Sequence, residues 1–274
     1  MTAPDLFSIA GRTVVITGGM GKLGLRMVGT VLERGARVAI LDSVVDGKAL
    51  AEPLETARRN GRLVAVRADV TQRASLEAAA DTIERALGAP ADGLLTCAAL
   101  DSPPDAPASQ NGPLEEYPAD VWDKVMAVNV KGTFLSCQTF GARMRKTGRG
   151  SIINVSSIYG TVSPDQRIYA YRHARGEQFY KPVSYSTSKS ALYNLTRYLA
   201  TYWGPFGVRV NTVTFGGVFD NQDPKFLEAY SSHVPLGRMA RPGEYDATIV
   251  FLLSEGSSYI TGADIVVDGG WTAW

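Results

Sequence analysis

The stretch Thr13-Val14-Val15-Ile16-Thr17-Gly18-Gly19-Met20-Gly21-Lys22-Leu23-Gly24 decides the fold of this chain. Its first five residues form an apolar, β-branched run typical of a buried strand, and a helical pattern follows the glycines. Glycines at such a turn let the backbone bend tightly and approach a pyrophosphate at the positive end of the helix. The stretch therefore predicts a dinucleotide site, with Gly18, Gly21, Lys22, Leu23 and Gly24 around the phosphates.

Strand-like and helix-like segments alternate along the rest of the chain. Further strands are predicted at 37–41, 63–66, 93–96, 151–155, 208–213 and 264–267. They are nearly continuous in Val, Ile and Leu, as expected when helices cover both faces of a parallel sheet. The pattern predicts one doubly wound, Rossmann-type α/β domain over residues 1–274, with seven parallel strands. The segments 101–113 and 160–182 have loop-like compositions.

The composition excludes several classes of function. The 274 residues carry a net charge of +1, so neither nucleic acid nor an anionic membrane is an expected partner. We expect a cytoplasmic protein, because no apolar run reaches membrane-spanning length and the first residues lack a signal-peptide pattern. Cys97 and Cys137 do not make a disulfide framework, and with two histidines, His173 and His233, no metal site is expected.

An aspartate at the end of the second predicted strand bears on the choice of cofactor. Asp42 lies eighteen residues beyond Gly24, where a carboxylate can accept hydrogen bonds from an adenosine ribose. The same carboxylate would repel a 2′-phosphate, so NAD is the expected cofactor and NADP is disfavoured. Asp69 and Val70, after the third strand, are expected at the adenine end. A simple turn residue at the strand end is the alternative for Asp42.

A tyrosine and a lysine four residues apart form the second informative motif. Tyr185 and Lys189 begin a segment with helical periodicity, so both side chains should lie on one helix face. A neighbouring ammonium favours the phenolate and would lower the pKa of Tyr185. Such a phenol can exchange a proton with a substrate oxygen near neutral pH. Taken alone, the pair would be explained better as a surface tyrosine beside a lysine.

With the other motifs included, the chain resembles the short-chain dehydrogenase/reductase family over essentially its whole length. The resemblance rests on an ordered set of motifs. They are Thr17 to Gly24, Asp69-Val70, Asn129 within 126–132, Ser156-Ser157 after a strand, Tyr185 with Lys189, Val208-Arg209-Val210-Asn211, Tyr259-Ile260-Thr261-Gly262 and Asp268-Gly269-Gly270. The resemblance implies an NAD(P)-dependent enzyme that interconverts an alcohol and a carbonyl compound on a small-molecule substrate.

Four residues match the catalytic tetrad of that family, namely Asn129, Ser157, Tyr185 and Lys189. The resemblance implies that Tyr185 is the acid/base and that Lys189 lowers its pKa and binds the nicotinamide ribose. Ser157 would hydrogen-bond the substrate oxygen. Asn129 would organise a water that links Lys189 to solvent, and a purely structural buried amide is its alternative.

The cofactor half departs from the family pattern at three places. Lys22 stands where the usual turn has its second glycine, and Thr96-Cys97-Ala98-Ala99 replaces the family's Asn-Asn-Ala-Gly. Phe215-Gly216 replaces its Pro-Gly. The resemblance implies that the backbone at Ala98 lies beside the adenosine and that Gly216 and Val218 lie near the nicotinamide.

The largest departure is the spacing of 28 residues between Ser157 and Tyr185, which is much shorter in most of the family. The additional chain, residues 160–182, is called the insert below. It is tethered to catalytic residues at both ends and has more basic than acidic side chains, which suits a polar, anionic substrate such as a sugar phosphate or sugar acid. Tyr159 and Arg167 are expected contacts. A cover over a subunit interface, with the arginines paired to carboxylates, is an equally good interpretation.

The tract 215–222 resembles the branch of the family found in bacterial surface-sugar pathways, including those for legionaminic-type nonulosonic acids. There Phe219 would stack on a sugar face and Asn221 would bond to hydroxyls, with packing and helix capping as the alternative. We therefore expect NAD-dependent interconversion of a secondary alcohol and a ketone on a polar, anionic, sugar-like substrate. The alternatives are an NADPH-dependent reductase of lipid or polyketide carbonyls and a non-catalytic cofactor-binding protein.

Two features suggest assembly with further copies of the chain. Family members commonly form a four-helix dimer interface from the helices that correspond to 120–146 and to the segment after Tyr185. A homodimer or homotetramer is therefore expected. Trp271 and Trp274, at the end of the chain, are expected to pack against a neighbouring subunit.

Overall fold

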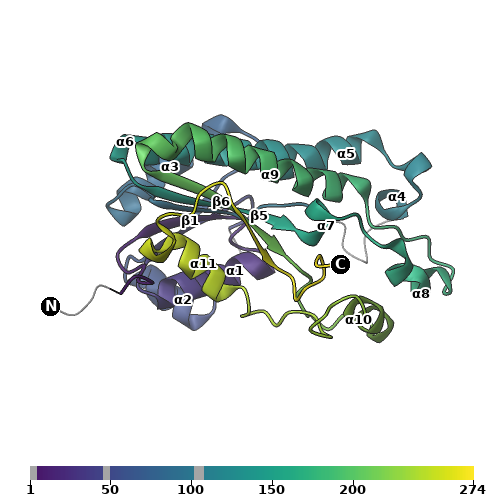
Figure 1. The fold of residues 1–274 in the computed structure, drawn as a ribbon. Coiled ribbons are helices and arrows are strands. Elements are labelled where there is room, and N and C mark those ends of the chain that lie inside the picture. The colour runs from purple at the N-terminus through teal and green to yellow at the C-terminus, as the bar shows by residue number, and fades with distance from the viewer. Residues whose placement is uncertain (1–4, 46–49, 102–107) are drawn as a thin grey trace.

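The computed structural model describes residues 5–45, 50–101 and 108–274. Its centre is a seven-stranded parallel sheet in the order β3-β2-β1-β4-β5-β6-β7 (Figure 1). The strands are β1 (Thr13–Thr17), β2 (Arg37–Asp42), β3 (Leu63–Arg67), β4 (Gly93–Thr96), β5 (Gly150–Ser157), β6 (Val208–Phe215) and β7 (Asp264–Val267). The predicted doubly wound fold is confirmed.

Helices cover both faces of this sheet, as Figure 1 shows. One face carries α3 (Arg73–Leu87), α5 (Ala119–Met126), α6 (Thr133–Thr147) and α9 (Val183–Trp203). The other face carries α1 (Lys22–Glu33), α2 (Glu52–Arg59) and α11 (Asp246–Leu253). Because helices cover both faces of the sheet, the central strands are long apolar runs in the sequence.

The first strand shows how the two faces acquire separate cores. Successive side chains of a strand point to opposite faces. Val14 and Ile16 accordingly join the core beneath α1 and α11, which includes Met27. Val15 joins the core beneath α3, α6 and α9, which includes Phe140. All three strand residues are fully buried.

Two strands extend further than their apolar runs predicted. β5 and β6 stay paired to the register Ser157↔Phe215. Ser156 and Ser157 are therefore the last residues of β5, whereas the sequence placed them after the strand. The extra pairing holds Ser157 on rigid backbone at the carboxyl edge of the sheet, where ligands of doubly wound folds bind.

The predicted long helix over 120–146 is interrupted. Between α5 and α6 the residues Ala127–Gly132 form a π-helical segment that contains Asn129. Its flanking residues keep right-handed helical dihedrals, so the helix continues through the irregularity. Single π turns inside α-helices are frequent at functional sites.

Short helices gather at the carboxyl edge of the sheet (Figure 1). The insert is not the plain loop that its composition indicated. It begins in α7 (Ile158–Thr161) and contains a 3₁₀ turn, Gln166–Tyr169, followed by α8 (Ala170–His173). α10 (Pro224–Ser231) follows β6, and α4 (Ala108–Asn111) lies in the other predicted loop, of which residues 102–107 are outside the described residues.

Candidate active site

The glycine turn after β1 is shaped by close packing. Gly18 has φ +64°, and a Cβ added there would lie 2.7 Å from the Cα of Ala98. A Cβ on Gly24 would lie 2.3 Å from the carbonyl oxygen of Gly18. α1 then begins at Lys22, with Gly21 as its N-cap residue, no side-chain cap and no acidic residue in the first turn. An uncapped helix start approached by bare backbone is suited to a phosphate group.

A cavity of about 310 Å³ continues from this turn across the ends of β2, β3 and β4. It brings together six of the predicted cofactor residues, namely Gly18, Gly21, Asp42, Asp69, Val70 and Ala98. The Asp42 carboxylate accepts the backbone N–H groups of Met20 at 3.0 Å and Val44 at 3.2 Å, which fixes its direction. These residues fit the adenosine half of a dinucleotide.

Lys22 and Leu23 lie beside this cavity at the start of α1. Leu23 packs against the core beneath α1. The Lys22 ammonium is exposed and forms an ion pair with Asp220, in the segment that follows β6. This pair links the glycine turn to the region where Gly216 and Val218 line the second half of the site.

Three tetrad residues converge at the end of β5. The Tyr185 phenol, on the first turn of α9, and the Ser157 hydroxyl, at the end of β5, line the same cavity. The Lys189 ammonium donates to the carbonyl oxygen of Val155 at 2.9 Å and lies 5.8 Å from the centroid of the Tyr185 ring. The predicted shared helix face of Tyr185 and Lys189 is therefore present.

Burial dominates the protonation of both side chains. It lowers the pKa of the Lys189 ammonium to about 8. It raises the pKa of the Tyr185 phenol well above its ordinary value, and the nearby Asp101 carboxylate acts in the same direction. The hydrogen bond from Ser157 opposes this rise. The sequence predicted a lowered pKa for Tyr185; removal of the phenol from water reverses that direction here.

Asn129 is fully engaged by neighbouring groups. Its side-chain oxygen accepts the Leu100 N–H at 2.7 Å, and its amide donates to the Leu100 carbonyl at 3.0 Å and to Ser188 Oγ at 2.9 Å. The side chain is 1% exposed. These contacts match the structural alternative, and the proposed water relay to Lys189 stays a prediction.

A larger cavity of about 760 Å³ opens directly above Ser157 and Tyr185. Its walls come from the insert and from the segment after β6. Its lining residues are Asp101, Ser157, Ile158, Tyr159, Tyr169, Tyr171, Phe179, Lys181, Tyr185, Gly216, Gly217, Val218, Asp220, Asn221, Gln222, Asp223, Phe226, Tyr230 and Met239. Tyr159 and Asn221 thus lie where they were predicted. Asn221 has φ +57°, a conformation that Asn tolerates better than most residues.

Two predicted substrate contacts are not brought to this cavity. Arg167 is 88% exposed along its side chain and forms a bidentate pair with Asp165 within the same turn. Phe219 is 41% exposed and is not among the residues that line this cavity. Both lie on segments that do line the cavity, but their side chains point elsewhere, which residue type alone cannot reveal.

The other basic residues of the insert are also paired with carboxylates. Arg172 pairs with Glu177, Arg175 pairs with Asp223 at 2.8 Å, and Lys181 pairs with Asp101. The arginines are paired with carboxylates, as expected if the insert covered a subunit interface. The insert nevertheless lines the pocket, as expected if it contacted substrate. The insert therefore contributes aromatic walls to the pocket, without a free arginine cluster.

Sequence reasoning missed the aromatic floor of the pocket. Tyr230 of α10 belongs to none of the sequence motifs. It is nevertheless only 3% exposed, and its hydroxyl accepts the Gly217 N–H at 2.6 Å. Trp271 stacks on Tyr230 at 4.3 Å and is 7% exposed. It therefore packs inside its own chain, against the expectation of a contact with a neighbouring subunit. Trp274 is 80% exposed.

Within residues 5–45, 50–101 and 108–274, no cluster of three or more His, Cys, Asp or Glu side chains could hold a metal ion. In the same ranges, the structure contains no helix with the length and apolarity needed to cross a membrane.

Comparison with known proteins places this geometry in a family. A family model described as enoyl-(acyl carrier protein) reductase matches residues 23–272. A D-threitol dehydrogenase of Mycolicibacterium smegmatis is 34% identical, over 97% of this chain and 95% of its own. A galactitol 2-dehydrogenase (L-tagatose-forming) of Cereibacter sphaeroides is also 34% identical, over 98% of each chain.

Solved structures agree with these relatives. A short-chain dehydrogenase from Leptospira borgpetersenii with bound NAD⁺ superposes with a TM-score of 0.83 at 30% identity, covering 99% of this chain and 97% of the other. A gluconate 5-dehydrogenase from Burkholderia cenocepacia, in complex with NADP and tartrate, gives 0.81 at 26% identity and 98% coverage of each chain. The surface-sugar branch is not tested by these similarities. By its fold, its matched model and its relatives, this chain is an oxidoreductase that belongs to the short-chain dehydrogenase/reductase family.

Proposed function

We propose that the protein is an NAD-dependent dehydrogenase that oxidises a secondary hydroxyl of a neutral polyol to a ketone and catalyses the reverse reduction. The observation that carries the proposal is the pocket in which Ser157 and Tyr185 lie beneath walls of aromatic, hydroxyl and amide groups. Such walls supply apolar area and a few hydrogen-bonding groups, as small-molecule sites do.

The charges of the pocket favour a neutral substrate over the anionic one that the sequence suggested. The charged residues among its described lining are Asp101, Asp220, Asp223 and Lys181. Each carboxylate has a basic partner, supplied by Lys181, Lys22 and Arg175 respectively. An anionic sugar would have to break one of these pairs to gain a cation. The relatives named for threitol and galactitol act on neutral polyols, which supports this choice.

The tetrad residues would handle the proton of the substrate hydroxyl group. The glycine turn and Asp42 would hold NAD, which when bound would supply the acceptor for the hydride of the substrate carbon. Tyr185, as phenolate, takes the hydroxyl proton, while Ser157 holds the substrate oxygen within reach of the phenol. Lys189 stabilises the phenolate by its charge, and with a pKa of about 8 the buried ammonium still carries that charge near neutral pH.

The preference for NAD over NADP rests on one carboxylate. Asp42 ends β2 at the rim of the adenosine cavity, and its direction is fixed by two backbone N–H groups. A 2′-phosphate at that rim would meet a fixed negative charge. Arg37, the nearest basic residue of β2, is held elsewhere by the carbonyl oxygens of Leu87 and Gly11.

The proposed enzyme is a cytoplasmic homodimer or homotetramer. Exposed aromatic side chains on the outer helices support assembly, with Tyr198 and Tyr202 of α9 63% and 52% exposed and Phe134 of α6 41% exposed. Such rings are typical of interfaces. Light scattering behind a sizing column measures the mass; a monomer at micromolar concentration would contradict this part of the proposal.

The first experiment is NADH formation at 340 nm with C3 to C6 polyols, sugar phosphates, sugar acids and apolar secondary alcohols. The proposal expects turnover of neutral polyols with NAD. Tyr185→Phe should lower kcat by at least about 10²-fold while NAD binding is retained, which excludes a contaminating activity. Turnover confined to sugar phosphates or sugar acids, or to apolar carbonyls with NADPH, would contradict the neutral-polyol assignment.

A further inference from the structure

The insert places a second cation at the catalytic phenol. Lys181, which precedes α9 by two residues, holds its ammonium 4.7 Å from the centroid of the Tyr185 ring. The tetrad lysine, Lys189, lies farther away, at 5.8 Å. The Lys181 side chain is 9% exposed and its ammonium also pairs with Asp101. All three partners, Lys181, Asp101 and Tyr185, line the substrate pocket.

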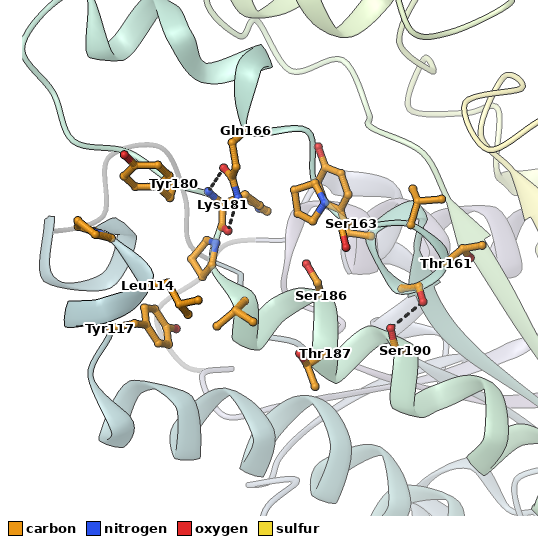
Figure 2. Close-up of a pocket in the computed structure, with 18 of the residues that line it drawn as sticks. Leu114, Tyr117, Thr161, Ser163, Gln166, Tyr180, Lys181, Ser186, Thr187 and Ser190 are labelled. Atoms are coloured by element: carbon orange, nitrogen blue, oxygen red, sulfur yellow. Dashed lines mark hydrogen bonds between the residues drawn. The ribbon is translucent and has the colours of Figure 1, made fainter. Parts of the chain in front are cut away.

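The backbone of Lys181 is held by the insert itself. Figure 2 shows the Gln166 side-chain amide facing the Lys181 peptide, where it accepts the Lys181 N–H at 2.8 Å and donates to the Lys181 carbonyl at 3.1 Å. The preceding residue, Tyr180, donates its N–H to the carbonyl of Asn111 at 2.7 Å. A second cavity, of about 680 Å³, lies on the far side of this junction and shares Lys181 and Tyr159 with the substrate pocket.

We propose that Lys181, whose backbone is held by Gln166 and whose ammonium pairs with Asp101, acts through Tyr185: the ammonium over the phenol ring stabilises the phenolate that accepts the substrate proton. Supplying this cation is then one function of the insert. The proposal rests on the proposed dehydrogenase function, because the proton that Tyr185 accepts is the one released when the hydroxyl carbon gives its hydride to NAD. Lys181 is a positioning residue, since it acts on the phenol and not on the reacting atoms.

The charges around the Tyr185 phenol determine whether loss of Lys181 would favour or disfavour the phenolate. The other described groups that act on or lie near the Tyr185 phenol come from four parts of the chain. They are Lys189 of α9, Asp101 after β4, Tyr159 of α7 and Ser157 of β5. Asp101 acts against the phenolate, and Lys181 offsets it by direct pairing. Loss of the Lys181 charge would leave the Asp101 carboxylate alone beside the phenol.

The test is the pH dependence of kcat/KM for polyol oxidation, which rises as the base becomes deprotonated. Lys181→Met should move this rise to higher pH by about one unit, because it removes a positive charge that lies 4.7 Å from the centroid of the Tyr185 ring in a partly solvated site. Lys181→Arg should keep the wild-type position. Asp101→Asn should move the rise to lower pH. Lys146→Met, an exposed lysine at the end of α6, is the matched control and should move nothing.

Two outcomes overturn the proposal. A lower kcat/KM for Lys181→Met without displacement of the pH rise would show that Lys181 only supports the pocket wall. If that variant does not fold, an unchanged profile for Asp101→Asn overturns the proposal in its place.

A measurement that needs no turnover separates this proposal from the proposed function. Ring-labelled tyrosine followed by NMR in the NAD⁺ complex reports the Tyr185 titration directly, with Tyr185→Phe identifying its resonance. A later titration in Lys181→Met supports the proposal even when no polyol is oxidised. Coincident titrations in wild type and variant overturn it even when polyols are good substrates.

Discussion

Asn129 donates its side-chain amide to the Oγ of Ser188 at 2.9 Å, and Ser188 Oγ in turn donates to the carbonyl oxygen of Tyr185 at 2.7 Å. The π-helical segment that carries Asn129 is thereby tied to the first turns of α9. The same amide group holds both backbone groups of Leu100. Three parts of the site, from α9, the π-helical segment and the segment after β4, are thus fixed by one side chain.

Asn129→Ala should therefore lower the free energy of unfolding by about 2–4 kcal/mol, because it removes three hydrogen bonds, two of which serve the partly buried backbone N–H and carbonyl of Leu100. Urea unfolding measures this. Asn194→Ala, on the exposed face of α9, is the matched control and should change stability by less than about 0.5 kcal/mol. Equal stability of both variants would show that water replaces the amide at no cost.

Asp42→Ala should relax the choice of nucleotide. Removal of the carboxylate loses the ribose contacts of NAD and the repulsion of NADP together, so the ratio of kcat/KM for NAD over NADP should fall by about tenfold or more. Asp69→Ala is the control, because Asp69 lines the same cavity and is predicted to contact the adenine that both nucleotides share. An unchanged ratio in Asp42→Ala would assign the preference to other residues.

Lys189→Met should make the protein more stable near neutral pH while abolishing turnover. Burial lowers the Lys189 pKa from 10.5 to about 8, which corresponds to a folding penalty of about 3 kcal/mol below pH 8. Between pH 8 and 10.5 only the unfolded state keeps the proton, so wild-type stability rises with pH and the penalty disappears above that range. Loss of the hydrogen bond to Val155 offsets part of the gain, leaving about 1–2 kcal/mol at pH 7.

Thermal unfolding from pH 7 to 10 tests this, with Lys146→Met as the exposed control. The difference between Lys189→Met and wild type should shrink as pH rises. A variant that is less stable at pH 7, or a difference that does not vary with pH, would mean that the lysine is solvated in the folded protein. A gain in stability with loss of activity is the usual signature of a residue kept for function.

The parts of this molecule that could be predicted from sequence are those fixed by local chemistry. Val14, Val15 and Ile16 predict a strand because both faces of the sheet are covered at this strand, so all three residues are apolar. Gly18 predicts the turn because a Cβ would not fit beside Ala98. The pairing of Tyr185 with Lys189 could be predicted because a spacing of four residues brings two side chains to one face of α9. Asn129 was identified through the family resemblance, and its π-helical setting leaves no mark on the apolar periodicity.

The insert could not be predicted in the same way. Its six charges fit a substrate clamp or a set of internal ion pairs equally well, and only the folded path decides between them. Arg167 pairs with its neighbour Asp165, whereas Lys181 reaches Asp101 eighty residues away and the ring of Tyr185. Sequence showed the excess of positive charge; tertiary contacts determined which cation faces the catalytic phenol.

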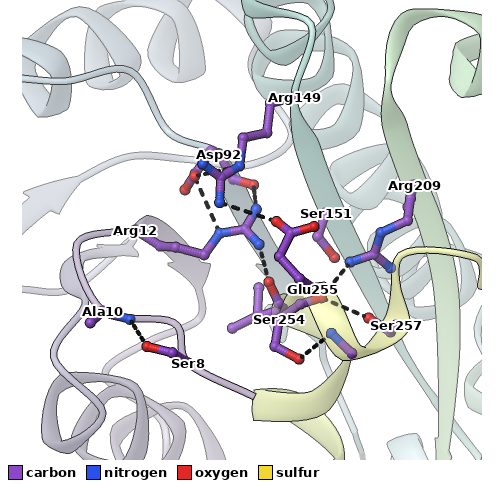
Figure 3. Close-up of polar contacts among 12 residues, drawn as sticks. Ser8, Ala10, Arg12, Asp92, Arg149, Ser151, Arg209, Ser254, Glu255 and Ser257 are labelled. Carbon is purple, nitrogen blue, oxygen red and sulfur yellow. Dashed lines mark hydrogen bonds and ion pairs between the residues drawn. The ribbon is translucent and has the colours of Figure 1, made fainter. Parts of the chain in front are cut away.

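A network of charged side chains at the amino ends of the strands, away from the pocket, leads to a prediction about stability alone. Figure 3 shows Arg12, Arg149 and Arg209 gathered with Asp92 and Glu255 near the amino ends of the strands. Arg209 donates to the carbonyl oxygens of Ile260 at 3.2 Å, Leu252 at 2.8 Å and Ser254 at 3.3 Å. Two of these carbonyls lie at the end of α11, where a cation also favours the helix dipole.

Arg209→Met should destabilise the protein by about 1–3 kcal/mol, because three hydrogen bonds from a partly buried guanidinium are lost. The loss is limited because each carbonyl keeps another donor, from Asn211, Ser151 or Ser257. Arg149→Met is the matched control. The Arg149 side chain is 57% exposed and its partner Glu255 is 61% exposed, so its loss should change stability by less than about 0.5 kcal/mol. Both variants should keep the wild-type KM for NAD and for polyol, since this network lies across the sheet from the pocket. A changed KM in Arg209→Met, with stability intact, would mean that the packing of α11 is coupled to the active site.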